Sequence, residues 1–450
     1  MEAPRADVVV KGWLRTVRNS KEIVFLNVND GSNLAGVQVV VDGELANVEA
    51  VRHLGTGSAI AVTGTLVESL AKGQRVEIKA SKVEILGAAA PDYPLQKKRH
   101  NFEFLRTIAH LRNRTNTFGA VFRVRSALAH AVHCFFQDRE FVYVHTPIIT
   151  AADSEGAGEL FRVTTLDLDK LPRTEAGAID WREDFFGKST YLTVSGQLNG
   201  ETFALGMSDI YTFGPTFRAE NSHTARHASE FWMIEPEMAF CDLDDDCDLA
   251  EAFVKHLLTT VLERCPEDMA FFNDHIDKGI VGQLEAVVAA EFERMTYAEA
   301  VERLTKSGKK FEFPVHFGAN LQAEHERYLT EELVGRPVFV TDYPKEIKAF
   351  YMRRNDDGRT VAAMDLLVPR VGEMLGGSQR EERSDVLEAI FAEGHMPASE
   401  YQWYLDTRRY GTAPHAGFGL GFDRMVMYAT GMQNIRDVLP FPRTPNNCEF

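Results

Sequence analysis

The most constraining feature of this sequence is a stretch, residues 211–240, that alternates with a period of two. It reads YTFGPTFRAENSHTARHASEFWMIEPEMAF. Apolar residues hold every second position of its first arm, and a second alternating arm follows the polar run NSHTARHA. Because successive side chains of a strand point to opposite faces, the pattern predicts two half-buried strands joined by a loop.

One face of the predicted hairpin collects charged and aromatic side chains. It carries Arg218 and Glu220 from the first arm and Phe231, Glu235 and Glu237 from the second. The simplest interpretation is a solvated sheet face with ordinary salt bridges, as in most hairpins. The alternative is a binding face, and the rest of the sequence favours it.

Length and composition predict a soluble globular protein of two domains. A chain of 450 residues exceeds one comfortable core, and its 44% hydrophobic and 26% charged residues are an ordinary globular composition. No apolar run approaches the roughly 18 residues of a membrane span, and the first residues lack the apolar core of a signal peptide. Five cysteines without a CxxC pair argue against a disulfide framework or structural zinc. We therefore expect a cytoplasmic protein with no membrane association.

The net charge of −17 is unevenly distributed. Residues 1–100 contain 13 Lys and Arg against 11 Asp and Glu, whereas the remainder contains 36 against 55. This excludes a general electrostatic attraction for phosphate but allows a local basic face on the N-terminal part.

The N-terminal 87 residues contain five short strand-like runs, most of them separated by turn signals such as NDGSN and AKGQ. Five strands without a long helix predict a small closed barrel, most commonly an OB-fold. Residues 88–101 are small, proline-bearing and basic, which is typical of a linker.

Residues 102–450 form the larger predicted domain. Its recurring hairpin arms and weak βαβ alternation predict an α+β fold with a mainly antiparallel sheet flanked by helices. We expect a helical, acidic segment from about residue 242 to 302, within an insertion of about 242–340 to which no function can be assigned. Its CDLDDDCDL run lacks a complete metal-ligand set and is interpreted as a solvated loop.

Two further patterns allow ligand chemistry. Gly417, Gly419 and Gly421 alternate, so one strand face has no side chains there and a flat ligand or another backbone can approach. Asp365 and Glu373 are two carboxylates that a divalent cation shared with polyphosphate requires. Surface charge is the alternative interpretation of this pair.

Together these stretches resemble the class II aminoacyl-tRNA synthetases. A helix and strand at about residues 120–147, the hairpin at about 211–240, and HAGFGLGFDR at about 415–430 resemble motifs 1, 2 and 3 of that class. With VSGQLNGE and NIRDVLPFPRTP, the chain is most similar to the asparaginyl enzymes of subclass IIb. The resemblance covers essentially the whole chain, barrel included.

The resemblance implies an ATP site with Arg218 and Arg424 as catalytic residues. Arg218 would hold the α-phosphate and stabilise charge as the amino-acid carboxylate attacks. Glu220 would accept from the adenine amino group, and Phe231 and Arg424 would cover the two adenine faces. Arg424 would also reach the γ-phosphate, and His227 would touch the terminal phosphates.

The resemblance also implies Mg²⁺, held by Asp365 and Glu373. Such chemistry needs in-line positioning and preorganised positive charge, and it needs no covalent nucleophile.

The amino-acid site implied by the family includes Glu155, Ser195 and Gln197, which would hold the α-amino group. Aspartyl enzymes place a lysine three residues after this glutamine, where the present chain has Gly200. A carboxamide substrate needs one acceptor and one donor, which Glu235 and Arg380 can supply. Glu235 would repel the carboxylate of aspartate, so we expect asparagine as the substrate.

The tRNA end implied by the resemblance lies on the barrel. Phe25 would stack on the central anticodon uridine and Gln38 would bond it, although an ordinary core phenylalanine is the alternative. Arg15, Arg18 and Lys21 could add phosphate contacts. The expected partners are therefore tRNA(Asn), L-asparagine and, through motif 1, a second copy in a homodimer.

Three other functions share this pattern. They are an aspartyl-tRNA synthetase of relaxed specificity, a paralogue that makes asparagine from aspartate, and a non-catalytic RNA-binding relative. The missing lysine at Gly200 argues against the first, and the anticodon domain argues against the second. The retained Arg218, Arg424, Asp365 and Glu373 argue against the third.

Overall fold

The computed structural model describes residues 5–69, 73–152, 160–394 and 398–450. The chain divides into two compact units. The first takes the chain up to Ser126, together with Cys265–Lys278 and Phe450, and the second takes Ala127–Arg264 and Gly279–Glu449. The domain limits expected from the sequence, 1–87, 88–101 and 102–450, therefore remain a proposal, because these units group segments by packing and not by chain order.

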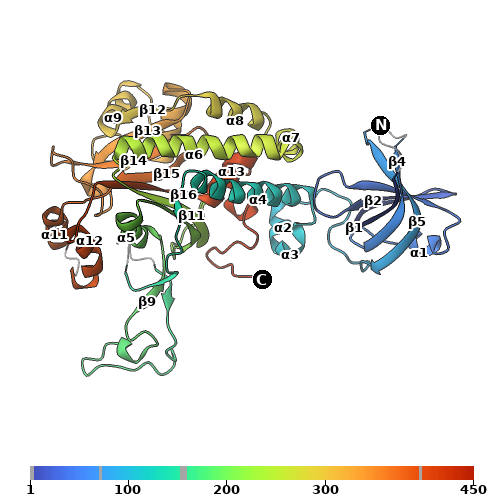
Figure 1. Cartoon of the computed structure of the whole chain (residues 1–450), viewed down its shortest axis with the longest axis horizontal. Coiled ribbons are helices and arrows are strands. Elements are labelled where there is room, and N and C mark those ends of the chain that lie inside the picture. Colours follow the sequence, from blue (N-terminus) through green and yellow to red (C-terminus); the bar gives the residue numbers. More distant parts are fainter. Residues whose placement is uncertain (1–4, 70–72, 153–159, 395–397) are drawn as a thin grey trace. The chain divides into compact units, whose positions relative to one another are not determined.

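A closed five-stranded barrel forms the N-terminal part of the first unit, as the sequence predicts (Figure 1). Its strands follow the order β1-β2-β3-β5-β4, and a short helix, α1, follows β3. The elements are β1 (Arg5–Asn19), β2 (Ile23–Asn29), β3 (Val37–Asp42), α1 (Val48–Arg52), β4 (Ala59–Glu68) and β5 (Val76–Gly87).

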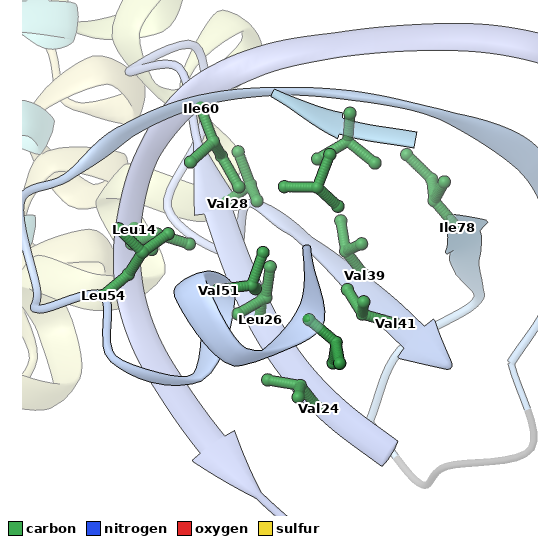
Figure 2. Packing of buried hydrophobic residues seen from close by; sticks show 13 residues of the cluster. Leu14, Val24, Leu26, Val28, Val39, Val41, Val51, Leu54, Ile60 and Ile78 are labelled. Carbon is green, nitrogen blue, oxygen red and sulfur yellow. The ribbon is translucent and has the colours of Figure 1, made fainter. Parts of the chain in front are cut away.

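The barrel closes because alternate aliphatic side chains of each strand point inward. Val24 and Leu26 of β2 pair with Val41 and Val39 of β3, and all four are almost fully buried (Figure 2). Each such burial stabilises the fold by about 1.5–3 kcal/mol before entropy is counted. The residues between them, Phe25 included, therefore face outward.

Four helical segments complete the first unit. They are α2 (Phe102–Thr107), α3 (Ala109–Arg112), the first half of α4 (Asn116–Gln137) and α7 (Pro266–His275). The Asn101 side chain caps α2 by accepting from the Phe104 amide at 2.8 Å. Leu95, Leu105 and Phe118 form the small core of this region.

The second unit is built on an eight-stranded sheet with the order β12-β13-β14-β15-β16-β11-β10-β6. Only the β6–β10 and β12–β13 pairs are parallel, which confirms the predicted mainly antiparallel sheet. Its strands are β6 (Val142–Tyr143), β10 (Asp209–Phe217), β11 (Glu230–Ala239), β12 (Glu293–Thr296), β13 (Val338–Pro344), β14 (Thr360–Val368), β15 (Gly372–Gln379) and β16 (His415–Gly421). A small second sheet pairs β7 (Ile149–Thr150), β9 (Thr190–Leu192) and β8 (Arg162–Val163).

Helices cover this sheet. Helix α6 packs on β14, β15 and β16, whereas α5 packs on β10 and β11. The helices are α5 (Gln197–Met207), α6 (Leu243–Arg264), α8 (Ile280–Ala289), α9 (Tyr297–Lys306), α10 (Ala323–Arg327), α11 (Ser384–Glu393), α12 (Gln402–Arg409) and α13 (Phe422–Thr430). Shorter helical turns cover Trp181–Glu183, Tyr328–Leu333, Lys345–Ile347, Ala398–Glu400 and Ile435–Asp437.

The segment expected to be helical from about residue 242 to 302 is divided in the structure. Pro266 starts a separate helix because proline fits the first helical turn but not a helix interior. Gly279 interrupts the chain again with a φ of +90°, and β12 then joins the sheet through β13. The CDLDDDCDL run lies mainly in the first turns of α6, where Cys247 is buried against Met364 instead of lying in a solvated loop.

The predicted hairpin is formed by β10 and β11. Its register places Thr212 opposite Glu235 and Thr216 opposite Phe231, so these side chains share the predicted face. The opposite face is covered as well, because Tyr211 stacks on Phe136 of α4 with 4.6 Å between ring centroids. The sequence predicted half-buried strands, but β10 and β11 are covered on both faces and lie inside the sheet, so they are more deeply buried than predicted.

No helix within the described ranges is long and apolar enough to cross a membrane. All five cysteines are free thiols.

Gly417 of β16 permits the close pairing of β16 with β11. A Cβ atom at this position would lie 2.2 Å from the carbonyl oxygen of Pro236 and 2.6 Å from Cδ of Glu237. Of the two roles that the glycine alternation allowed, Gly417 therefore has the second: it lets another backbone strand, β11, approach closely. At Gly419 the nearest atom is a flexible one, Cε of Met233 at 2.9 Å.

We expect Gly417→Ala to destabilise the second unit by about 1–3 kcal/mol, because the added methyl group overpacks the sheet. Gly214→Ala is the matched control in β10, where a Cβ would meet nothing within 4 Å. Guanidinium unfolding followed by tryptophan fluorescence measures both variants. Equal midpoints for the two variants would contradict this account of the sheet.

Candidate active site

Two adjoining cavities lie in the second unit, beside strands β11, β15 and β16. The larger has a volume of about 490 Å³ and the smaller about 130 Å³. They share four lining residues, Arg218, Met233, Glu373 and Gly419. The two cavities therefore form one continuous site between β11, β15 and β16.

The cavities bring together most of the residues proposed from the sequence. The larger cavity is lined by Ser195, Gln197, Arg218, Glu235, Asp365, Glu373 and Arg380. The smaller is lined by Arg218, Glu220, His227, Phe231, Glu373 and Arg424. Glu155 lies outside the described residues.

The carboxylate of Glu235 is held at three points. It accepts from the Gly196 amide at 2.9 Å, from the Thr212 hydroxyl at 3.1 Å and from the Ser195 hydroxyl. Glu235 is 5% exposed, so its position is set before any ligand arrives. Ser195 therefore acts on Glu235 in this structure, in addition to lining the cavity.

Arg380 is paired with Glu237 and not with Glu235. Its guanidinium donates to both carboxylate oxygens of Glu237, at 3.1 Å for the Nε contact, and its Nη1 donates to Ser378 at 2.8 Å. Burial opposes the charge of Arg380, but the carboxylate of Glu237 outweighs it and raises the pKa of Arg380. Arg380 is thus a permanent cation that already has a counter-charge.

Gln197 is oriented by a buried carboxylate, Glu201, one turn further along α5. The Gln197 amide donates to Glu201 Oε1 at 2.7 Å, and an ionised carboxylate only accepts. The carbonyl oxygen of Gln197 must therefore point away from Glu201, where it can accept from a ligand.

Glu201 is itself the centre of a fully buried network. Tyr404 donates to its two oxygens at 2.9 and 2.8 Å, His415 lies 2.9 Å away, and Arg408 forms an ion pair with it. Burial raises the pKa of Glu201, but Arg408 and His415 outweigh this and hold it below its usual range. The carboxylate therefore stays ionised.

The smaller cavity brings one aromatic ring, Phe231, together with the guanidinium groups of Arg218 and Arg424. The Arg218 guanidinium carbon lies 5.4 Å from the Phe231 ring centroid. Arg424, at the start of α13, donates to the Glu373 carbonyl at 2.9 Å. Asp423 fixes this helix start by accepting from the Trp232 amide of β11 at 2.8 Å.

His227 lines the same cavity from the loop between β10 and β11. Its Nδ1 atom lies 3.0 Å from the Ser222 hydroxyl and 2.5 Å from the Thr224 hydroxyl. Burial lowers the pKa of His227, and the neighbouring Arg424 lowers it further, although Glu220 opposes them. The ring is therefore neutral at pH 7, with Nε2 as the nitrogen not used by these hydroxyls.

Asp365 and Glu373 provide carboxylate oxygens, the ligands that a divalent cation such as Mg²⁺ prefers. Both face Gly376, since a Cβ there would lie 3.1 Å from Asp365 Oδ1 and 3.9 Å from Glu373 Oε1. The glycine thus leaves an open cradle beside two carboxylates. Lys348 forms an ion pair with Asp365, and its Nζ lies 2.8 and 2.6 Å from the two carboxylate oxygens.

Within the described residues no group of three or more His, Cys, Asp or Glu side chains could hold a metal by itself. Two carboxylates suffice for Mg²⁺ when phosphate and water supply the other ligands. The pair therefore fits the predicted role.

Sequence reasoning missed five residues that shape the site. They are Glu201, Arg226, Glu237 as the partner of Arg380, Lys348 and Asp423. Glu201 has a local signal, because it follows Gln197 by four positions on a helix. Lys348 and the pairing of Glu237 depend on contacts between distant segments, for which the sequence has no signal.

On the barrel, Phe25 and Gln38 share the outer face. Phe25 pairs with Val40 across β2 and β3, and Gln38 lies two positions from Val40. The Gln38 side chain donates to Glu77 at 3.1 Å, and the Arg18 guanidinium carbon lies 5.9 Å from the Phe25 ring centroid.

Comparison with known proteins agrees with this geometry. Residues 101–445 match the family model of class II tRNA synthetases (D, K and N), and residues 8–86 match the OB-fold nucleic acid binding domain. The chain is 63% identical to an asparagine–tRNA ligase of Geobacter sulfurreducens, covering 99% of this chain and 96% of that one. It is 60% identical to one of a Nostoc species, covering 99% and 97%.

A solved structure is similar as well. It is a crystal structure of asparaginyl-tRNA synthetase from Pyrococcus horikoshii complexed with asparaginyl-adenylate. The TM-score is 0.86 at 32% identity, and the match covers 99% of this chain and 97% of that one.

We expect Glu201→Ala to destabilise the protein by about 3–5 kcal/mol, because it leaves the buried guanidinium of Arg408 without its counter-charge. Glu302→Ala, which removes an exposed pair with Lys306, is the control and should change stability by about 0.5 kcal/mol or less. Chemical denaturation measures both. A Glu201→Ala loss no larger than that of the control would contradict the network described above.

Proposed function

This chain belongs to the class II tRNA synthetases of the D, K and N group, and on that premise we propose that it attaches L-asparagine to tRNA(Asn) in two steps. In the first, an asparagine carboxylate oxygen attacks the α-phosphorus of ATP, and pyrophosphate leaves as the asparaginyl-adenylate forms. In the second, a terminal ribose hydroxyl of the tRNA attacks the carbonyl carbon, and AMP leaves.

The observation that supports the choice of asparagine is the charge of the groups around Glu235 and Arg380 in the larger cavity. Arg380 is the cation there, and Glu237 already neutralises it. Glu235 adds an uncompensated carboxylate on the same face. A negatively charged side chain would meet net negative charge, whereas a carboxamide can donate to Glu235 and accept from Arg380.

Gly200 supports the same choice. A Cβ atom added at Gly200 would lie 3.6 Å from Cγ of Glu237, so a longer side chain would extend toward Glu237 and Thr212. A lysine there would bring a second cation to the pair of Arg380 and Glu237. Its absence leaves the balance in favour of a neutral substrate.

Positioning by charge accounts for the activation step. Arg218 lines both cavities, so it can hold the α-phosphate where the two substrates meet. Phe231 and Arg424 line the smaller cavity and would enclose the adenine, with Glu220 accepting from its amino group. Arg226 and His227 lie on the same loop and would face the terminal phosphates.

The α-amino group of asparagine is proposed to bond the carbonyl oxygen of Gln197, which Glu201 turns away from itself. Ser195 and Glu155 would complete this contact. Asp365 and Glu373 would hold Mg²⁺, which neutralises phosphate charge when it is bound. The role of Lys348 before the metal arrives is to compensate Asp365.

We further propose a homodimer formed through β6 and its surroundings. β6 is the edge strand of the sheet, and Val142 and Tyr143 on it are exposed. Phe203 and Met207 of α5 are exposed apolar residues as well. An edge strand with such neighbours is suited to pairing with a second copy. The five free thiols fit a reducing compartment, so we propose that the enzyme acts in the cytoplasm.

The proposed substrate predicts that ATP–pyrophosphate exchange is supported by asparagine and not by aspartate. Glu235→Gln should raise the KM for asparagine, because the amide replaces an acceptor by a donor at one oxygen. It should also lower the preference for asparagine over aspartate by about tenfold or more, since the repelling charge is gone.

Glu324→Gln provides the matched control, because Glu324 accepts from the backbone amides of Glu312 and Phe313 and lines neither cavity. It should leave the exchange reaction unchanged. If the unmodified enzyme prefers aspartate, asparagine is not the substrate. If Glu235→Gln keeps the preference of the unmodified enzyme, only the role proposed for Glu235 is wrong.

We expect Phe25→Ala to raise the KM for tRNA(Asn) by about tenfold, because stacking of one base on an aromatic ring is worth about 1–3 kcal/mol. The exchange reaction without tRNA should not change. Steady-state charging of a tRNA(Asn) transcript measures the effect, and Val9→Ala, another exposed apolar residue of the barrel, is the control. Equal KM values for the two variants would exclude Phe25 from anticodon binding.

A further inference from the structure

A third cavity, with a volume of about 790 Å³, lies entirely within the first unit. It shares no lining residue with the two cavities of the candidate active site. Its walls come from residues 13–16 of β1, residues 29–31 at the end of β2, residues 56–57 before β4, residues 93–100 of the linker, and residues 110–116 from α3 to the start of α4. Its volume lies in the range of about 300–1,000 Å³ typical of ligand sites.

The lining is strongly basic. Arg15, Lys97, Lys98 and Arg114 all contribute to it, and none of them forms an ion pair with another described residue. The one carboxylate of the lining, Asp30, accepts from the amide and hydroxyl of Ser32. In a chain of net charge −17, four uncompensated cations around one cavity indicate an anionic ligand.

Arg15 gives the strongest indication of an anionic ligand. Its Nε atom is buried and has no hydrogen-bond partner within the described residues. Burial lowers the pKa of Arg15, and the nearby cations Arg123 and Arg114 lower it further, although Tyr93 opposes them. An anion in the cavity would relieve the repulsion between these cations.

The cavity also offers aromatic surface. The Arg114 guanidinium carbon lies 5.9 Å from the Trp13 ring centroid and 5.8 Å from that of Tyr93. Trp13 is 43% exposed although it is large and apolar. Tyr93 is held against Gly57, where a Cβ would lie 2.7 Å from Cζ of the tyrosine. Rings beside cations suit a base attached to a phosphate, and inorganic phosphate alone would not use them.

The walls of the cavity are fastened to one another. Arg123 of α4 donates to the Gly31 carbonyl at 2.8 Å and makes a bidentate contact with Asp268 of α7. This ties the turn after β2 to the helices of the same unit. A ligand therefore meets a preorganised surface, which lowers the entropy cost of binding.

We propose that this cavity is a second binding site for tRNA, separate from the anticodon face, in which Arg15, Lys97, Lys98 and Arg114 contact the phosphate backbone and a base packs against Trp13. The inference rests on the proposed function for its choice of RNA. The site is distinct because Asn29, on its rim, lies four residues along β2 from Phe25, about 13 Å at 3.3 Å per residue.

The test compares binding of a tRNA(Asn) transcript by the full chain and its variants over a range of salt concentrations. Arg114→Ala should raise the Kd about tenfold and reduce the slope of log K against log salt by about one, as for a lost phosphate contact. Trp13→Ala should raise the Kd about tenfold with an unchanged slope, because it removes stacking and no charge. Arg114→Lys should keep the slope but recover only part of the affinity.

Lys82→Ala is the matched control, because this exposed barrel cation lies outside the cavity and is already paired with Glu84 at 3.3 Å. It should leave the Kd within about twofold of the unmodified protein. Thermal unfolding followed by circular dichroism confirms that each variant is folded, and asparagine-dependent exchange without tRNA should be unchanged in all of them.

Two results would overturn the inference. One is a tRNA affinity of both folded variants, Arg114→Ala and Trp13→Ala, equal to that of Lys82→Ala. The other is binding of AMP alone at this cavity that Arg114→Ala abolishes while tRNA binding is unaffected, which would make it a nucleotide site. Failure of asparagine to support exchange would instead refute the proposed function, and tRNA binding would still report on the cavity.

Discussion

The candidate site depends on buried carboxylates that are each matched to a particular donor set. Glu237 forms an ion pair with Arg380. Glu201 is bound by Arg408, Tyr404, His415 and Gln197. Glu235 accepts hydrogen bonds from the Gly196 amide and two hydroxyls. Buried charges without partners cost several kcal/mol, so each acid has one arrangement that is stable. This fixes the directions of the Gln197 amide and the Glu235 carboxylate, on which the proposed role of the site in choosing a neutral substrate is based.

The same constraint explains the glycines around the site. Gly417 leaves room for Glu237 to reach Arg380, and Gly376 leaves the space that Asp365 and Glu373 face. A larger residue at either position would move a carboxylate away from its partner. The positions of these carboxylates thus depend on backbone packing as well as on their ion pairs.

The first unit is organised differently. The closed barrel is held by aliphatic side chains and carries its charge on the outer face and in the cavity beside the linker. The proposed surface for RNA therefore has a local charge that differs from the acidic average of the chain. An overall charge of −17 is therefore compatible with a nucleic-acid partner, because binding depends on local charge.

The sequence by itself determined strands and their faces, but not the division of residues 242–302 into separate elements. Period-two alternation was enough to predict the five barrel strands and to place Phe231 and Glu235 on one side of a hairpin, because neighbouring side chains of a strand must point to opposite faces. Strand β10 ends at Phe217, so Arg218 and Glu220 follow it and line the same cavity as Phe231 from the loop. Motif resemblance then supplied the family. Only the tertiary structure decided which charges meet, since Arg380 and Glu237 are 143 residues apart and Lys348, in the loop between β13 and β14, reaches Asp365 of β14. Pattern carries information about nearest neighbours along the chain, whereas ion pairs and cavities arise where the fold brings distant segments together.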